Sequence, residues 1–481
     1  MKALGIDVGS TTTKVVLADV SAGGVAELAV RVGNTPRDAP SLLALIARLC
    51  RDAIEGPGSE IAVVGIASMA ETGMPVDAHG EPLTELLRWD AGHGAAEAAR
   101  MAGLAPAVFA ATGVRLSAKS PLATWAWLRR DRREVWSRME RWMGAADLVA
   151  HALTGDPITD HTLAGRTGGY RLPAADRGLS TSFDVDLLAL VGLDPDRLPR
   201  VAAPDAVAAR SSALGSEAFG LAPGTPVIIA GHDHQVAAWA AGVRAPGDVA
   251  DSLGTAEAVL TVLPARPDPE SVRTQGMSLV RTIGGDHDGL VSGNGSSGGM
   301  LAHWLQSIEP DLRAPALEAA ERDRAKHPAP TGAPVAPYLR GRQTPDPDPN
   351  AQPGLPPSAW PNERQARAVT EGICYQSRWM IQSHADLGER PATVVQISGS
   401  RLPRVWTDTL RDVMPWPVAP SSAAEPVATG AALLAAVRAG LLGPVQDQLA
   451  RAPVLAAPTL PPPDGDPHGP AFRTFVRRSG G

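Results

Sequence analysis

Residues 226–256, PVIIAGHDHQVAAWAAGVRAPGDVADSLGTA, contain the pattern around which the rest of this chain can be interpreted. An apolar run rich in β-branched residues ends at Gly231 and is followed by a carboxylate between two histidines. A buried strand that stops there would hold Asp233 at the open end of a sheet, where a carboxylate can take a proton from a bound hydroxyl. We therefore interpret Asp233 as a candidate catalytic base, with an ordinary polar loop and a zinc site as the alternatives.

A glycine turn follows in the same stretch, at Leu253-Gly254-Thr255-Ala256. The backbone amides of such a turn, together with the Thr255 hydroxyl, are groups that receive phosphate oxygens. The segments on either side of the turn, residues 247–252 and 257–260, have the composition of two strands. The pattern predicts a hairpin that binds phosphate, near the middle of the chain.

The N-terminus has the same plan. Residues 3–6 are apolar, residues 7–14 (DVGSTTTK) read as a turn, and residues 15–19 are apolar and rich in β-branched residues again. The Walker spacing is absent, and a β-branched run rather than a helix follows the turn. A hairpin bent at Gly9 presents amides and threonine hydroxyls to a polyphosphate, while Asp7 can hold magnesium through water. A plain edge hairpin with solvated threonines is the alternative.

Two halves that each open with such a hairpin suggest a duplicated fold, although two short hairpins can also resemble each other by chance. The chain of 481 residues is too long for one core and suits two domains. We predict an α/β domain in residues 1–245, a second in residues 246–442 and a Pro-rich tail without clear periodicity in residues 443–481, with nucleotide in a cleft between the two domains.

The first half alternates helical and strand patterns. Residues 41–54 carry a helical apolar stripe, and residues 61–67 read as a buried strand. Because ligands of α/β sheets lie beyond the carboxyl ends of the strands, Glu71 is a candidate substrate contact, with a solvated loop residue as the alternative. In the second half, a long helix is predicted from Asn362 and a last helix over residues 425–439, closed by Gly440.

Composition narrows the class of protein. A net charge of −7 and a pI near 5.9 argue against a nucleic-acid surface, which requires a basic stripe. Cys50 and Cys374 lie far apart, so the sequence supports no disulfide framework and no cysteine metal site. The sequence contains no apolar run long enough to span a membrane, and it begins with a strand pattern. These features predict a cytoplasmic protein without nucleic-acid or membrane partners; a homodimer is compatible with the sequence, which does not determine the oligomeric state.

Six segments, in this order, resemble the FGGY carbohydrate kinases, which include the xylulose, fuculose, gluconate and glycerol kinases. They are LGIDVGSTTTKVVLAD, GAADLVAHALTGDPITDHTLAGRT, LAPGTPVIIAGHDHQVAAWAAG, DSLGTAEAV, PYLRGRQTPDPDP and EPVATGAALLAAVRAG. The resemblance covers about residues 3–442. It implies an α/β fold of two actin-like (ribonuclease-H-like) domains with a nucleotide- and sugar-binding cleft between them. It also implies ATP- and Mg²⁺-dependent phosphorylation of a hydroxyl of a sugar or polyol.

The resemblance assigns roles to individual residues. It implies that Asp233 is the catalytic base and Asp7 the magnesium-linked carboxylate. The residues that it places on the nucleotide are Ser10, Thr11, Thr12, Lys14, Gly254, Thr255, Gly299 and Gly399, with Ser400 in the same turn as Gly399. The residues that it places on the acceptor sugar are Glu71 and His234, beside Asp233.

The chain also departs from the family pattern. The glycine triplet before the last nucleotide-binding helix reads Ser398-Gly399-Ser400-Arg401, and Ala70 replaces the usual arginine or methionine before the substrate carboxylate. The segment often written Trp-x-Asp-x-Arg is WDAGH in residues 89–93, and Arg342 replaces a usual acidic residue. A neutral ketose such as xylulose, or a related sugar of four to six carbons, is the predicted substrate. An actin-like ATPase acting on a partner and a sugar-binding pseudokinase remain the alternatives.

Overall fold

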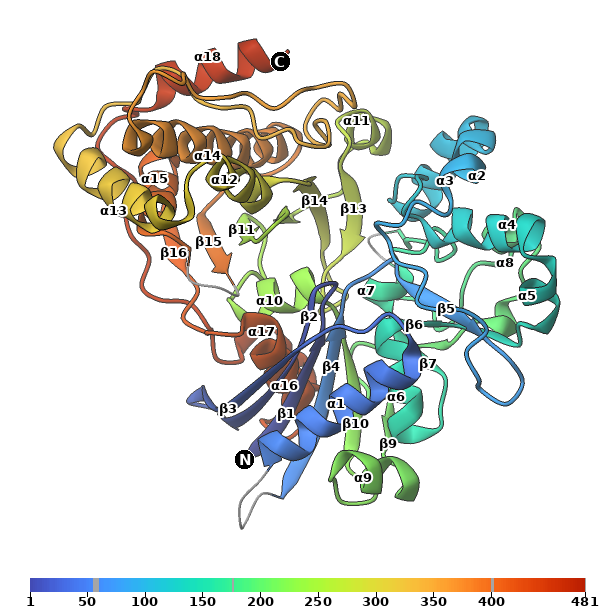
Figure 1. Ribbon diagram of the computed structural model, residues 1–481. Helices are drawn as coiled ribbons and strands as arrows, with labels where there is room; N and C mark the ends of the chain where they lie inside the picture. The colour runs from blue at the N-terminus through green and yellow to red at the C-terminus, as the bar shows by residue number, and fades with distance from the viewer. Residues whose placement is uncertain (55–59, 175–176, 399–401, 481) are drawn as a thin grey trace. The chain divides into compact units, whose positions relative to one another are not determined.

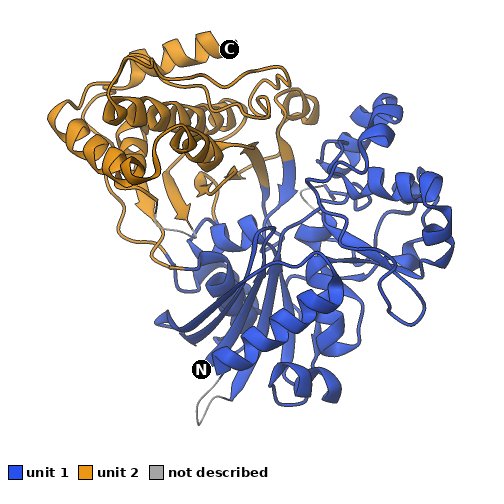
Figure 2. Ribbon diagram, viewed as in Figure 1, with its two compact units in different colours: residues 1–244, 279–288, 425–455 blue, residues 245–278, 289–424, 456–481 orange. Residues whose placement is uncertain are grey.

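The structure, a computed structural model, describes residues 1–54, 60–174, 177–398 and 402–480. These residues form two compact units (Figure 2). Unit 1 comprises residues 1–244, 279–288 and 425–455, and unit 2 comprises residues 245–278, 289–424 and 456–481, with residue 481 outside the description. Each unit is an α/β domain built on a sheet with parallel and antiparallel strands, and the α/β class is the predicted one. The domain limits at residues 245 and 442 and the cleft between the domains stay predictions.

Unit 1 contains a six-stranded sheet in the order β3-β2-β1-β4-β10-β9 (Figure 1). The strands are β1 (Lys2–Val8), β2 (Thr12–Ser21), β3 (Gly24–Asn34), β4 (Ile61–Ser68), β9 (Ala209–Arg210) and β10 (Pro226–His232). β1 and β2 form the predicted antiparallel hairpin, whereas β1, β4 and β10 run parallel. The carboxyl ends of these three strands therefore meet at one edge of the sheet.

Helix α16 (Pro426–Arg438) packs directly on this sheet. A Cβ atom at Gly5 of β1 would lie 1.8 Å from the Ala428 carbonyl oxygen, and one at Gly65 of β4 would lie 2.0 Å from that of Ala431. Only glycine permits so close an approach of helix and strand. On the apolar core of the same strands pack α1 (Ala39–Ile54) and α6 (Ala145–Thr154). The predicted helices at residues 41–54 and 425–439 are thus confirmed.

The other elements of unit 1 are short. Two small sheets pair β5 (Gly73–Val76) with β6 (Arg141–Gly144), and β7 (Ile158–Asp160) with β8 (Arg200–Ala202). The remaining helices are α2 (Ala95–Arg100), α3 (Ala105–Thr112), α4 (Pro121–Asp131), α5 (Arg133–Arg138), α7 (His161–Ala164), α8 (Val185–Ala189), α9 (Ala213–Phe219), α10 (Asp233–Ala240) and α17 (Val445–Arg451), with 3-10 turns at Ala102–Leu104 and Pro195–Arg197.

A second six-stranded sheet, most of whose residues lie in unit 2, has the order β13-β14-β12-β11-β15-β16. Its strands are β11 (Asp248–Leu253), β12 (Glu257–Leu263), β13 (Ser278–Arg281), β14 (Asp288–Asn294), β15 (Thr393–Ser398) and β16 (Val418–Pro420). β11 and β12 form an antiparallel hairpin, and β11 runs parallel to β15. This is the arrangement of β2, β1 and β4, so the plan of unit 1 recurs in unit 2.

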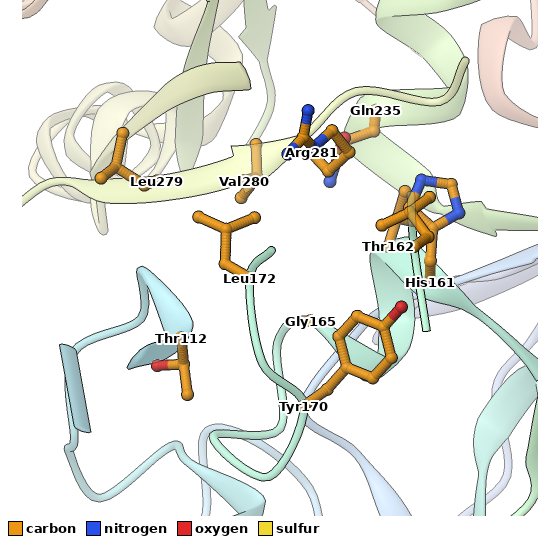
Figure 3. A pocket seen from close by; sticks show the side chains of 11 residues that line it. Thr112, His161, Thr162, Gly165, Tyr170, Leu172, Gln235, Leu279, Val280 and Arg281 are labelled. Atoms are coloured by element: carbon orange, nitrogen blue, oxygen red, sulfur yellow. The ribbon is translucent and has the colours of Figure 1, made fainter. Parts of the chain in front are cut away.

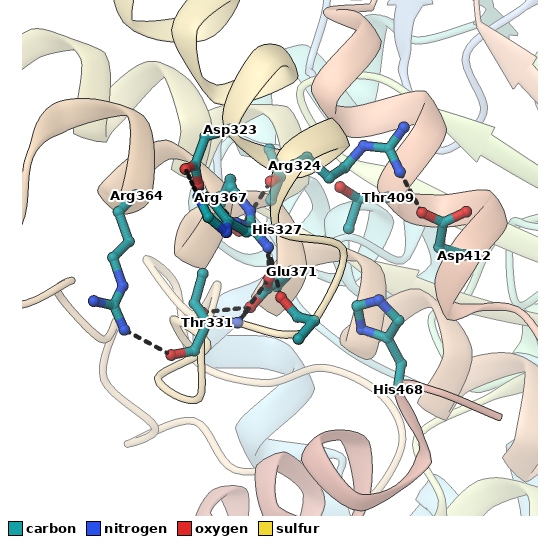
Figure 4. A network of polar contacts seen from close by, with 12 residues as sticks. Asp323, Arg324, His327, Thr331, Arg364, Arg367, Glu371, Thr409, Asp412 and His468 are labelled. Carbon is teal, nitrogen blue, oxygen red and sulfur yellow. Dashed lines mark hydrogen bonds and ion pairs between the residues drawn. The ribbon is translucent and has the colours of Figure 1, made fainter.

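Helices cover the sheet of unit 2. They are α11 (Pro269–Thr274), α12 (Ser297–Gln306), α13 (Pro310–Lys326), α14 (Asn362–Leu387), α15 (Arg404–Val413) and α18 (Gly469–Ser479). Helix α14, predicted from Asn362, forms the centre of the apolar core. Ion pairs join α13 to its neighbours: Arg367 contacts Asp323 at 2.7 Å, and Arg324 contacts Asp412 of α15 (Figure 4). Charged side chains thus fix the helix layer around the core.

The last residues differ from the expected aperiodic tail. Helix α17 belongs to unit 1, and α18 buries Phe472 and Phe475 against Tyr375 of α14. Arg342, which the sequence left without an interpretation, donates hydrogen bonds to the carbonyl oxygens of Ser479 and Asp346. The apolar face of α18 consists mainly of these two phenylalanines. So short an apolar pattern, in a segment rich in proline, did not indicate a helix in the sequence.

Candidate active site

The parallel strands of unit 1 bring three predicted site residues to one edge. Asp7 is the penultimate residue of β1, Glu71 follows the end of β4, and Asp233 directly follows β10 as the first residue of α10. In the strand register, Asp7 and Gly231 both pair with Ala67, so β1 and β10 end at the same level of the sheet. Ligands of α/β sheets bind beyond such an edge.

Asp7 is a buried carboxyl group that is only 6 % exposed. Its Oδ1 atom has no hydrogen-bond partner among the described residues. Burial and the negative charge of Asp233, against the opposing effect of Lys14, together raise the pKa of Asp7 to about 8. A buried carboxyl group that interacts with a second carboxylate and has a free oxygen fits a site that binds a cation.

Asp233 is held by its neighbours in the chain. Its Oδ1 accepts a hydrogen bond from the backbone N–H of His234 at 2.7 Å and lies 3.2 Å from Nε2 of His232. Burial lowers the pKa of His232 to about 4, more than the negative charge of Asp233 raises it. His232 is therefore a neutral imidazole near neutral pH, and the position of Asp233 is fixed at the N-terminus of α10.

Side chains from other segments donate hydrogen bonds to the turn of the β1–β2 hairpin. The Thr35 hydroxyl donates to the Gly9 carbonyl at 2.8 Å, and Arg88 donates to the carbonyl of Ser10 at 2.6 Å. Ser10, Thr11 and Thr12 lie at the accessible turn, whereas Lys14 pairs with Glu425 of unit 1 at 2.5 Å. The turn is fixed in shape and open to a ligand, as a phosphate-binding loop requires.

Unit 2 brings its predicted nucleotide residues together. The Gly298 N–H donates to the Gly254 carbonyl and the Gly299 N–H to the Thr255 carbonyl, both at 3.0 Å. A Cβ at Gly298 would lie 2.5 Å from the Gly254 oxygen, so the N-terminus of α12 packs tightly against the turn of the β11–β12 hairpin. Gly399 and Ser400 lie outside the described residues.

Glu71 lies in a strained loop and has a partner that the sequence did not reveal. Its φ of 61° is in the left-handed region, which is uncommon for a residue with a side chain and is concentrated at functional sites. Nη2 of Arg166 donates to Oε1 of Glu71 at 2.6 Å. Both residues act electrostatically on His232, so this pair lies near the Asp233 segment. His234, the other predicted substrate contact, follows Asp233 and has a side chain 45 % exposed.

Arg166 lies in the segment DHTLAGRT, which resembles the family pattern, but its role depends on its contact with Glu71, 95 residues earlier in the chain. Its Nε and Nη1 atoms are buried and have no hydrogen-bond partner among the residues that the structure describes. The guanidinium group is therefore engaged mainly by Glu71. We interpret Arg166 as a positioning residue that holds Glu71 in its strained loop.

A pocket in unit 1 adjoins the helix that begins with Asp233 (Figure 3). Its lining includes Tyr170, Leu279, Arg281 and Gln235 of α10. The Gln235 side chain is buried, and neither atom of its amide has a hydrogen-bond partner in the described part of the chain. The sequence pattern around Asp233 had given Gln235 no role.

The chain matches both domains of one protein family. Residues 2–240 match the N-terminal domain, and residues 249–439 the C-terminal domain, of the FGGY family of carbohydrate kinases. The chain belongs to the FGGY family of carbohydrate kinases. FGGY kinases are phosphotransferases with an alcohol group as acceptor, and this chain is such an enzyme. The predicted family, fold class and enzyme class are thereby confirmed.

Relatives in the FGGY family differ in substrate. The chain is 23 % identical to a gluconokinase of Bacillus subtilis, covering 90 % of this chain and 86 % of the relative. It is 29 % identical to a xylulose kinase of Streptomyces rubiginosus, covering 90 % of this chain and 87 % of the relative. The structure of a xylulose kinase from Lactobacillus acidophilus matches with a TM-score of 0.85 at 20 % identity, covering 99 % of this chain and 96 % of that one. This structural match supports the fold.

No helix within residues 1–54, 60–174, 177–398 and 402–480 is both long and apolar enough to cross a membrane.

Proposed function

We propose that this FGGY kinase transfers the γ-phosphoryl group of ATP to a hydroxyl of a neutral ketose or polyol of four to six carbons. The observation that carries the proposal is the convergence of Asp7 and Asp233 at one sheet edge, where the negative charge of Asp233 acts on Asp7 and helps to raise its pKa. The β1–β2 turn, which begins two residues after Asp7, offers amides and hydroxyls for the phosphates.

Asp233 acts in this proposal as the general base. Its carboxylate is held at the start of α10 by the His234 N–H and accepts the proton of the acceptor hydroxyl as the bond to phosphorus forms. The hairpin turns at Ser10–Thr12 and Gly254–Thr255 bind phosphate oxygens and hold the donor in line with that hydroxyl. Because the transition state is loose, positioning and charge stabilisation supply most of the catalysis.

Asp7 is the proposed residue for Mg²⁺. Its buried Oδ1, which has no hydrogen-bond partner among the described residues, is the hard oxygen ligand that this ion prefers, so Asp7 fits the metal. When bound, Mg²⁺ neutralises the charge of the phosphates. The protein contributes the buried carboxyl group and the rigid strand that carries it.

The Glu71–Arg166 pair supports a neutral substrate. The carboxylate of Glu71 accepts hydrogen bonds from sugar hydroxyls, while Arg166 already neutralises its charge. Ala70, which is 8 % exposed, brings no donor or charge for a carboxylate-bearing sugar acid. Xylulose fits this chemistry better than gluconate, although relatives with both substrates exist.

A coupled ADP-release screen over tetroses, pentoses, hexoses, alditols and sugar acids tests the proposal. We expect ATP consumption that depends on an added neutral ketose or polyol, with glycerol and gluconate as poor acceptors. Gluconate or glycerol as the best acceptor would contradict the substrate class. Sugar-independent turnover would instead favour an actin-like ATPase, and no turnover with any acceptor would favour a pseudokinase.

Replacing Glu71 by alanine should lower kcat/KM for the best sugar about ten- to a hundredfold, the effect of one lost hydrogen bond to a buried polar group. Sugar-independent ATP hydrolysis should not change. Arg166→Gln should act in the same direction through KM, and Arg166→Lys should recover part of the loss because it keeps the charge beside Glu71. Steady-state kinetics of the three variants test both roles, and an equal loss of sugar-independent hydrolysis in Glu71→Ala would contradict them.

Replacing Asp7 by alanine should raise the Mg²⁺ concentration for half-maximal rate at least tenfold, because the buried oxygen atoms that fit the ion are lost. Magnesium titrations at saturating ATP and sugar measure this change. Asp52→Ala is the matched control, since Asp52 lies on α1 and pairs with Arg48 at the surface. Coincident titrations for Asp7→Ala and the control would remove Asp7 from the metal site.

A further inference from the structure

The junction of β10 and α10 brings three metal-ligating side chains together. His232, Asp233 and His234 each offer one ligand atom, and these atoms all lie within 4.8 Å of one another. The Asp233 Oδ1 atom is 3.2 Å from Nε2 of His232 and 3.8 Å from Nε2 of His234. The base catalyst of the proposed reaction is therefore flanked on both sides by imidazole nitrogens.

These separations match those of a small transition-metal centre. With bonds of about 2.0–2.2 Å, two ligand atoms of a tetrahedral zinc site lie roughly 3.4 Å apart. The two measured separations lie on either side of that value, and the ligand atoms of the two histidines are at most 4.8 Å apart, so rotation of the side chains would close the site around an ion. A nitrogen and oxygen ligand set of this kind suits Zn²⁺, whereas Mg²⁺ selects oxygen ligands and retains its waters.

The backbone of this segment is anchored before any metal binds. The His232 N–H donates to the Thr162 hydroxyl at 2.8 Å, and a Cβ at the preceding Gly231 would lie 2.4 Å from that hydroxyl oxygen. The side chains of His232, Asp233 and His234 are 14 %, 19 % and 45 % exposed. The side chains thus project from an anchored backbone and are partly exposed, so an ion can reach them.

We propose that His232, Asp233 and His234 form a site for Zn²⁺ or a similar transition-metal ion, separate from the magnesium site at Asp7. Arg166, a positive charge that acts on His232, is paired with Glu71 and opposes the ion weakly. A metal bound to Asp233 occupies the carboxylate that accepts the substrate proton, so it inhibits the kinase. The inhibition rests on the function proposed for Asp233, whereas the binding itself does not.

Titration of the metal-free full-length protein with Zn²⁺ against a chromophoric chelator, without ATP or sugar, tests the binding. We expect one tight equivalent, and at least a tenfold weaker affinity in His232→Asn and in His234→Asn. His303→Asn, which changes an exposed histidine of α12, is the matched control and should bind as the parent does. The same protein with Co²⁺ should show the intense visible absorption of a four-coordinate site.

Equal zinc affinity in the parent, both site variants and the control would overturn the proposal, as would the absence of any tight equivalent. Circular dichroism of each variant shows whether it is folded. Asp233→Asn changes the third proposed ligand to a side chain of nearly the same size and should also weaken zinc binding. In the kinase assay with excess Mg²⁺, buffered Zn²⁺ should inhibit the parent and a zinc chelator should restore the rate. Tight binding without inhibition would reject the inhibitory role, and zinc binding in a protein that phosphorylates no sugar would count against the proposed function alone.

Discussion

Asp233→Asn is expected to lower sugar phosphorylation at least a few hundredfold, the scale for loss of a general base that also orients its substrate. The amide oxygen can still accept the His234 N–H that now reaches Oδ1 at 2.7 Å, and the side chain has almost the same shape. An amide cannot take up the proton of a sugar hydroxyl near neutral pH. The loss should therefore appear in kcat, while the fold and the binding of ATP remain.

Single-turnover and steady-state assays with the best sugar from the screen measure this effect. Asp186→Asn, which changes an exposed residue of the short helix α8, is a control for the removal of one negative charge from unit 1. Turnover of Asp233→Asn within tenfold of the parent would remove Asp233 from the mechanism, whatever the result for Asp7.

The sequence was most informative where function and structure depend on neighbouring residues. The β1–β2 and β11–β12 hairpins were predicted because a turn and its two strands are local, and both form as antiparallel pairs. Asp7 and Asp233 could be singled out because each follows an apolar strand pattern. The charge of Asp233 acts on Asp7 because β1 and β10 both pair in parallel with β4. The periodicity of a single strand does not predict which strands will pair.

Contacts between distant segments were beyond sequence reasoning. Arg166 pairs with Glu71 across 95 residues, and neither residue lies in a periodic pattern that marks the other. Helix α18 packs on α14 through Phe472 and Phe475, which contact Tyr375. The long helices α1, α14 and α16 were predicted close to their observed positions, α1 from its apolar stripe and α16 from the glycine that closes it.

A buried arginine of α16 is the other residue whose loss should have a large effect. Nη1 of Arg438 donates to Asp160 at 3.1 Å and to the Ile229 carbonyl of β10 at 2.9 Å, and Nη2 donates to the Ile283 carbonyl at 3.1 Å. The side chains of Arg438 and Asp160 are 2 % and 1 % exposed. Burial alone would raise the pKa of Asp160, but His161 and Arg438 hold it well below the ordinary value for aspartate.

Arg438→Met is therefore expected to lower the free energy of unfolding by about 3–5 kcal/mol, because it leaves a buried carboxylate without its charge partner. The double variant Arg438→Met/Asp160→Asn should regain part of this loss, since the remaining buried group is neutral. In the parent, the stabilisation from the depressed pKa of Asp160 is present above its unfolded value of about 4 and is lost as the pH falls through the lower folded value.

Urea unfolding between pH 7 and pH 3 measures this effect. The free energies of unfolding of the parent and Arg438→Met should differ most at pH 7. The difference should be smaller in acid, because Asp160 of the variant takes up a proton there and no longer needs a charge partner. Arg451→Met, which changes an exposed arginine of α17, should leave the unfolding curve almost unchanged. A deficit that does not vary with pH would assign the loss to packing of α16 on β10 rather than to the buried charge.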